Sequence, residues 1–174
     1  MSPLDIDNGF RRLGFDLLGR RISQCEFRRE IARLLKQHFN CERANLWRIA
    51  VGDNGQELAR VATSDPGSHE TGNAPVLTEG ECPEFFAKIS SGGACICTNS
   101  PFVPECLARM LFSAPAGKLL STVVSVNGGV HGVIGCERLP AQGEWTSRDV
   151  QTLRRLTATV SLVMRRHERA QAAG

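Results

Sequence analysis

The sequence predicts a single α+β domain, with helices at both ends of the chain and two β-hairpins between them. The first hairpin pattern joins a strand over residues 43–51 to one over 56–63 through a Gly-Asp-Asn-Gly turn. The second joins residues 119–126 to 130–138 through Asn127-Gly128-Gly129, which accept a positive φ. Hairpin strands flanked by helices indicate an antiparallel sheet and an α+β fold. A length of 174 residues suits one domain with a sizeable core.

Two helices are predicted before the first hairpin. The first has one apolar stripe, spaced by four, three and four residues, and ends near Arg20. Its stripe consists of Ile6, Phe10, Leu13 and Leu17. The second helix begins at the capping box Ser23-Gln-Cys-Glu26, in which the Ser and Glu side chains bond to each other's backbone N–H. Asn40 is the expected end of this helix.

The middle of the chain is predicted to contain short elements. Residues 64–74 hold Pro66, Gly67 and Gly72 and are expected to form a loop. Pro83 suits the first position of a helix that runs through Ile89. A short strand over 94–98 and a short helix over 105–112 follow, joined by a proline-containing connector at 99–104.

A long helix is predicted after the second hairpin. Thr146 and Asp149 form a second capping box, and Trp145 is placed to pack on Val150 as a hydrophobic staple.

Composition excludes several classes of protein. The apolar share of 41% and the charged share of 22% are ordinary globular values. A net charge of +3 gives no reason to expect nucleic-acid binding, and the arginine pairs lack the interleaved aromatic residues of a nucleic-acid groove. The sequence has no signal-peptide pattern and no apolar run that could span a membrane, so a cytoplasmic protein without membrane contact is expected. Seven cysteines, an odd number, favour free thiols in a reducing compartment.

The final third of the chain resembles the GAF domain family. The resemblance rests on Gly132-Val-Ile-Gly-Cys-Glu-Arg138, then Trp145-Thr-x-x-Asp149, then a helix with apolar periodicity. It is strongest to the GAF modules of bacterial sensor kinases and cyclic-di-GMP signalling proteins. The resemblance implies a GAF domain over 23–169, a helical extension over 1–22 and a tail over 170–174.

What this resemblance implies is a fold and a class of function. The fold is a central antiparallel sheet, with the terminal helices on one face and the crossover helices and loops on the other. The function is sensory or regulatory: the domain binds a small molecule, relays a signal through helix-mediated dimerisation, or does both. An output domain such as a kinase or diguanylate cyclase is not expected within these residues. Neither the ligand nor any cofactor is identified by the sequence.

In GAF domains the pocket lies between the sheet and the crossover segments, and this chain offers a mixture of apolar and polar residues there. Arg109 is the most informative, because a guanidinium facing the cavity could pair with an anionic ligand, whereas on an exposed helix it is solvated. Glu137 matches a glutamate common in the similar modules. The full set of predicted ligand-binding residues is Phe85, Phe86, Cys97, Asn99, Arg109, Phe112, Ser121 and Glu137.

The C-terminal helix has two apolar ridges, which predicts a homodimer. One ridge suffices for packing on the sheet, so the second is left for another helix, unless a single wide stripe packs within the domain. The predicted interface residues are Phe10, Leu13, Leu17, Val160, Met164 and His167. A degenerate domain that serves only dimerisation is one alternative function.

Four cysteines fall in the crossover region: Cys82, Cys95, Cys97 and Cys106. Zinc sites usually draw on Cys-x-x-Cys pairs, and Cys95-x-Cys97 lacks that spacing. Buried thiols acting as small apolar groups are expected here, and no metal site is predicted. The alternatives are a redox sensor or an enzyme resembling the free methionine sulfoxide reductase, although the Ile-Ala-Cys-Asp segment of that enzyme is missing. No catalytic residue is predicted.

Overall fold

The computed structural model describes residues 3–53, 55–65, 76–91, 94–98, 104–114 and 116–172. The main helices are α1 (Pro3–Leu18), α2 (Gln24–Phe39), α3 (Pro83–Ser90), α4 (Glu105–Leu111) and α5 (Ser147–Ala172). The strands are β1 (Arg43–Gly52), β2 (Gly55–Thr63), β3 (Val76–Thr78), β4 (Ala94–Thr98), β5 (Lys118–Val126) and β6 (Gly129–Arg138). A short 3-10 helix, η1, covers Pro140–Gln142.

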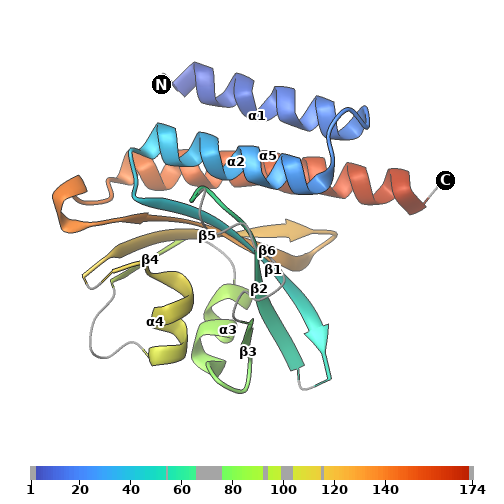
Figure 1. Ribbon diagram of the computed structural model, residues 1–174. Helices are drawn as coiled ribbons and strands as arrows, with labels where there is room; N and C mark the ends of the chain where they lie inside the picture. Colours follow the sequence, from blue (N-terminus) through green and yellow to red (C-terminus); the bar gives the residue numbers. More distant parts are fainter. Residues whose placement is uncertain are drawn as a thin grey trace.

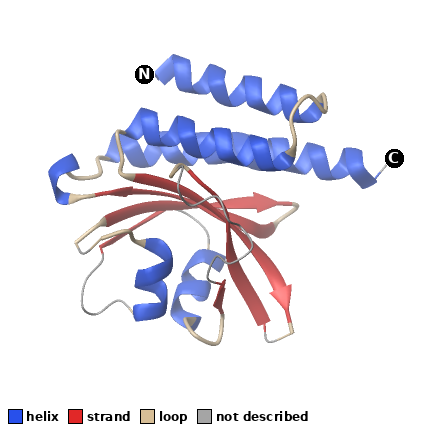
Figure 2. Ribbon diagram, viewed as in Figure 1, coloured by secondary structure: helices blue, strands red, loops and turns tan. Residues whose placement is uncertain are grey.

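The strands form one sheet of six in the order β3-β2-β1-β6-β5-β4, and every neighbouring pair is antiparallel. The sheet is curled, with α1, α2 and α5 on one side and α3 and α4 on the other (Figures 1 and 2). This arrangement confirms the predicted α+β class and the predicted division of helices between the two faces. Strand β3 was not predicted, because three residues are too few to carry a strand pattern.

Both predicted capping boxes are present. The Glu26 backbone N–H donates to Ser23 Oγ at 3.1 Å, and the Ser23 N–H donates back to Glu26 Oε2 at 2.8 Å. At the start of α5, the Asp149 N–H donates to Thr146 Oγ1 at 3.2 Å and the Thr146 N–H donates to Asp149 Oδ2 at 2.9 Å. Reciprocal bonds of this kind satisfy N–H groups that a helix start leaves unpaired.

Helix α1 packs across α2 and α5 as an outer layer on the helical side (Figure 1). Close approach depends on Gly14, since a Cβ there would lie 2.7 Å from Val163 Cγ2. The apolar stripe of α1 is buried in the same core as α2, α5 and the sheet. The second apolar ridge of α5 is therefore covered by α1 of the same chain.

A second core fills the other side of the sheet, beneath α3 and α4. Trp47, Leu58, Phe86, Leu111 and Phe112 belong to it. Two glycines of β6 make room for β1: a Cβ on Gly132 would collide with the Trp47 carbonyl, and one on Gly135 would lie 2.8 Å from the Trp47 ring. Within the described ranges, no helix combines the length and the apolar composition that a membrane span requires.

Candidate functional site

Strand β1 presents a row of large polar side chains to the second core. Its register with β6 pairs Arg43 with Glu137, Asn45 with Gly135 and Trp47 with Val133. Because side chains alternate along a strand, Arg43, Asn45 and Trp47 share one face. The intervening Ala44 and Leu46 pack in the helical core on the opposite face.

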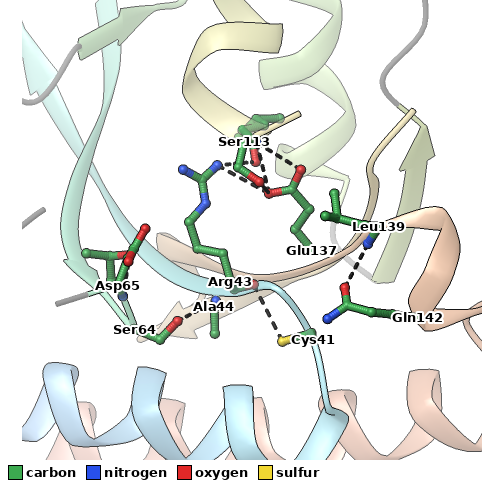
Figure 3. A network of polar contacts seen from close by, with 11 residues as sticks. Cys41, Arg43, Ala44, Ser64, Asp65, Ser113, Glu137, Leu139 and Gln142 are labelled. Atoms are coloured by element: carbon green, nitrogen blue, oxygen red, sulfur yellow. Dashed lines mark hydrogen bonds and ion pairs between the residues drawn. The ribbon is translucent and has the colours of Figure 1, made fainter. Parts of the chain in front are cut away.

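At one end of this row lies a buried network around Glu137 (Figure 3). The Glu137 side chain has no exposed surface, and its Oε2 lies 3.4 Å from Arg43 Nη2. Ser113, just after α4, donates its N–H to both carboxylate oxygens at 2.8 and 2.9 Å and its hydroxyl to Oε2 at 2.7 Å. Arg43 Nη2 also donates to the Leu111 carbonyl at 3.2 Å. The network therefore fastens the end of α4 to the centre of the sheet.

Burial lowers the pKa of Arg43 from its ordinary value, while the neighbouring Glu137 carboxylate acts in the opposite direction. Gly117 is required beside this network, because a Cβ there would collide with Glu137 Oε1.

The next residue, Arg138, points to the other face of β6 and connects the sheet to the terminal helices. Its guanidinium donates to the Phe39 carbonyl at 2.7 Å, to the Glu144 carbonyl at 2.8 Å and to Asp149 Oδ2 at 3.2 Å. It also lies 4.0 Å from the centre of the Trp145 ring. Glu137 and Arg138 thus link α4 on one face with the end of α2 and the start of α5 on the other.

The row on β1 carries buried polar atoms without hydrogen-bond partners. Within the part of the chain that the structure describes, seven such side-chain atoms occur, and three of them are Arg43 Nε, Asn45 Oδ1 and Trp47 Nε1. An unpaired buried donor or acceptor costs about 1–3 kcal/mol, so a group of three on one strand face calls for an explanation. Sequence reasoning missed these residues. The alternation of polar Arg43, Asn45 and Trp47 with apolar Ala44 and Leu46 was the available signal.

An open groove of about 430 Å³ lies beside α3. Its walls are the start and outer face of α3 with Cys82 and Phe85, Cys97 of β4, and Pro104 and Leu107 at α4. Most of its surface is apolar, and two carboxylates, Glu81 and Glu84, and one lysine, Lys88, also line it.

The predicted ligand-binding residues do not converge on one cavity. Phe85 and Cys97 line the groove, whereas Phe86 and Phe112 are buried in the second core. Arg109 points to solvent, with 73% of its side chain exposed, and lies 3.8 Å from Glu105. The proposed role of Arg109 as an anchor for an anionic ligand therefore has no support here.

Three predicted ligand-binding residues remain, and the two of them that the structure describes do not line the groove. Ser121 is buried on β5. The Glu137 carboxylate accepts hydrogen bonds from Ser113 and pairs with Arg43, as described above. Asn99 lies outside the described residues.

The predicted dimer residues lie mostly inside the chain. Phe10, Leu13, Leu17, Val160 and Met164 are all buried in the helical core, where α1 packs on α2 and α5. His167 is half-buried, with its Nε2 3.1 Å from Gln171 Nε2. The buried five cannot offer a surface to a second copy while α1 stays in place, so a dimer would need other residues.

The described cysteines are free thiols, and Cys82 and Cys106 lie 3.2 Å apart, sulfur to sulfur. Among the described residues, no group of three or more His, Cys, Asp or Glu side chains could hold a metal ion.

The chain belongs to the GAF domain family, whose model matches residues 26–164. No curated protein matches the sequence. Similar solved structures include residues 122–287 of a methyl-accepting chemotaxis protein, at 15% identity and a TM-score of 0.70, covering 92% of this chain and 99% of that one.

Two solved structures of GAF domains are similar over nearly the whole chain. The phycoerythrobilin-bound GAF domain of a cyanobacterial phytochrome has 8% identity and a TM-score of 0.69, with 98% of both chains covered. The GAF domain of the Acinetobacter phosphoenolpyruvate-protein phosphotransferase has 16% identity and a TM-score of 0.65, covering 100% of this chain and 98% of that one. At these identities the likeness establishes the shared fold.

Proposed function

We propose that this GAF domain is a cytoplasmic sensory module that binds a small molecule on the α3–α4 side of its sheet. The observation that carries the proposal is the row of unpartnered buried polar atoms on β1, Arg43 Nε, Asn45 Oδ1 and Trp47 Nε1. A ligand that completes their hydrogen bonds would gain affinity from groups that folding has already desolvated. The groove beside α3 lies on the same side of the sheet.

The chemistry of the row favours a neutral ligand. Arg43 and Trp47 supply N–H donors, and the Asn45 side-chain amide lies between them along the strand. The charge of Arg43 is already balanced by Glu137, so no anionic group is needed. The surrounding core is apolar and aromatic. A small planar molecule with alternating acceptor and donor groups on one edge, such as a neutral nitrogen heterocycle or cyclic amide, fits these features.

The signal would leave the site through β6. A ligand that shifts α4 acts on Ser113, whose three contacts end on Glu137, and the adjacent Arg138 holds the end of α2 and the start of α5. Such a chain of bonded groups transmits a signal only if α4 and the terminal helices change conformation together. The terminal helices would then pass the change to a partner copy or to an output domain such as a kinase or diguanylate cyclase.

A homodimer remains part of this proposal, with a changed interface. Phe15 of α1 is 66% exposed and Leu162 of α5 is 38% exposed, so both are available to a second copy. Light scattering of the full chain and of Phe15→Glu would test this surface. A concentration-independent monomer for the parent chain would remove dimerisation from the proposal.

The ligand proposal is tested by native mass spectrometry of the freshly purified full chain, followed by release of any bound molecule under denaturing conditions. We expect a small molecule at a stoichiometry near one per chain, and its loss in Asn45→Leu. Glu30→Gln, on the exposed face of α2, is the control that should keep it. A ligand retained equally by Asn45→Leu would refute the site.

A further inference from the structure

Four cysteines lie as two neighbouring pairs, on opposite sides of the sheet. Cys82, at the start of α3, and Cys106, in α4, have their sulfur atoms 3.2 Å apart. Cys41 and Cys136 are both buried in the helical core, where burial and the neighbouring Cys41 thiol raise the pKa of Cys136 well above its ordinary value. Both pairs consist of free thiols, and the difference between them is how far each is exposed to solvent.

The two pairs differ clearly in their exposure to solvent. Cys136 has no exposed surface and Cys41 is also buried. Cys106 is only partly buried, and Cys82 lines the open groove beside α3. A dissolved oxidant therefore reaches the first pair and is kept from the second, since thiol oxidation follows access to the sulfur.

The sulfur atoms of Cys82 and Cys106 need to move only a short distance to form a disulfide bond. A disulfide has its sulfurs about 2.05 Å apart, so they must approach by about 1.2 Å. The pair joins two short helices, of eight and seven residues, separated by 24 positions in the chain. A small rotation of either side chain, or a small shift of α4, can supply this movement.

We infer that Cys82 and Cys106 are a modification site, at which a hydroperoxide oxidises the pair to a reversible intramolecular disulfide. The inference goes beyond ligand sensing and stands whether or not a small molecule binds to the β1 row. It replaces the sequence-based expectation that these thiols act only as small apolar groups.

The reaction balances with hydrogen peroxide as the named oxidant. The sulfur of Cys106, the more exposed of the two, attacks one peroxide oxygen; the O–O bond breaks, a sulfenic acid forms, and the other oxygen leaves as water. The sulfur of Cys82 then attacks the sulfenic sulfur, the S–O bond breaks, and the proton of Cys82 leaves with the second water. Two thiols and one peroxide thus give one disulfide and two waters.

The order of attack follows from the greater exposure of Cys106 and from the pKa of Cys82. Burial, together with the hydrogen bond to the Cys106 thiol, raises the pKa of Cys82 to about 11. Cys82 therefore stays protonated at neutral pH and is a poor first nucleophile. It is well placed as the resolving thiol because its target already lies in contact with it.

Oxidation would tie α3 to α4. Since α4 is fastened to Glu137 through Ser113, the disulfide would hold α3, α4 and the sheet together as one unit. A dithiol reductant would release this link.

The test is peptide mapping of the full chain after mild treatment with hydrogen peroxide and alkylation of the remaining thiols. A Cys25→Ser background removes the exposed thiol of α2, which could crosslink separate molecules. We expect a linked peptide containing Cys82 and Cys106 that lacks two hydrogen atoms and disappears with dithiothreitol. The Cys41 and Cys136 peptides should stay fully alkylated after denaturation, which makes them the internal control.

Two variants separate the steps. In Cys82→Ser, a sulfenic-acid trap such as dimedone should label Cys106 several-fold more than in the parent, because the resolving thiol is gone. In Cys106→Ser, Cys82 should remain reduced. A crosslink through Cys97, overoxidation of Cys106 without a disulfide in the parent, or equal oxidation of the Cys41–Cys136 pair would overturn the inference.

Discussion

Replacing Glu137 by Gln should destabilise the domain far more than removing an exposed carboxylate. Glu137 is fully buried, accepts hydrogen bonds from the Ser113 N–H and hydroxyl, and pairs with Arg43, whose side chain is 11% exposed. Gln keeps the shape but turns one acceptor oxygen into an NH₂ group that faces other donors. It also leaves the buried guanidinium without its counter-charge.

The expected cost follows from these contacts. Hydrogen bonds to charged groups contribute about 1.5–3 kcal/mol, and breaking a buried ion pair costs about 3–5 kcal/mol. Ser113 is exposed and can be rehydrated, so we expect a loss near the lower end of the second range, about 3 kcal/mol. For a chain of this length that lowers the melting temperature by about 6–12 °C.

The assay is urea unfolding of Glu137→Gln and of the control Glu30→Gln. Glu30 pairs with Arg33 at 2.8 Å on the surface of α2, and its loss should cost less than about 0.5 kcal/mol. Hydrogen exchange in residues 105–113 should rise in Glu137→Gln, because α4 loses its attachment to the sheet. Equal stability of the two variants, with unchanged urea dependence, would refute this account of Glu137.

Three further predictions concern single features of the fold. Asn45→Leu should raise the stability of the ligand-free protein by about 1 kcal/mol, because it removes an unpaired buried polar group at little cost in volume; a loss of stability on urea unfolding would mean that the amide is satisfied. Gly132→Ala should cost about 2–3 kcal/mol through collision with the Trp47 backbone, whereas Gly129→Ala, with its nearest neighbour at 3.7 Å, should be far milder, and similar melting temperatures would contradict this. Burial lowers the pKa of both His38 and His131, so below their ordinary pKa of about 6.5 the unfolded chain binds protons more readily than the folded one. The free energy of unfolding should therefore be highest above about pH 7 and fall toward pH 5. In the double variant His38→Gln/His131→Gln this fall should be smaller. An identical pH dependence of stability in the variant and the parent would refute the role of the two histidines.

The sequence was sufficient for the elements whose signals are local. Both capping boxes and the two long hairpins depend on residues within a few positions of one another. The arrangement of the sheet and helices was implied by the resemblance to GAF domains at Gly132–Arg138. Strand β3 exists only because Val76–Thr78 pairs with Glu57–Ala59, which is information that a three-residue pattern does not contain.

The site was less predictable because burial depends on packing between distant elements. The second ridge of α5 predicts either a partner helix or one wide stripe packed within the domain, and nothing in the spacing distinguishes a second copy from α1 of the same chain. The sequence predicts Glu137 as a ligand-binding residue, whereas its hydrogen bonds to Ser113 depend on where α4 ends in space. The row at Arg43, Asn45 and Trp47 needed the strand register with β6 to be recognised.

The central claim, that a small molecule binds against the β1 row, is tested most directly by the fluorescence of Trp47. The chain has two tryptophans, and Trp145→Phe leaves Trp47 as the single fluorophore in the buried row. A titration with a panel of neutral nitrogen heterocycles and cyclic amides should produce a saturable change in Trp47 emission that disappears in Asn45→Leu, while Trp47→Phe, which retains Trp145, should show no change. A compound that binds by calorimetry without altering Trp47 emission, or one whose effect survives Asn45→Leu, would contradict the proposed site.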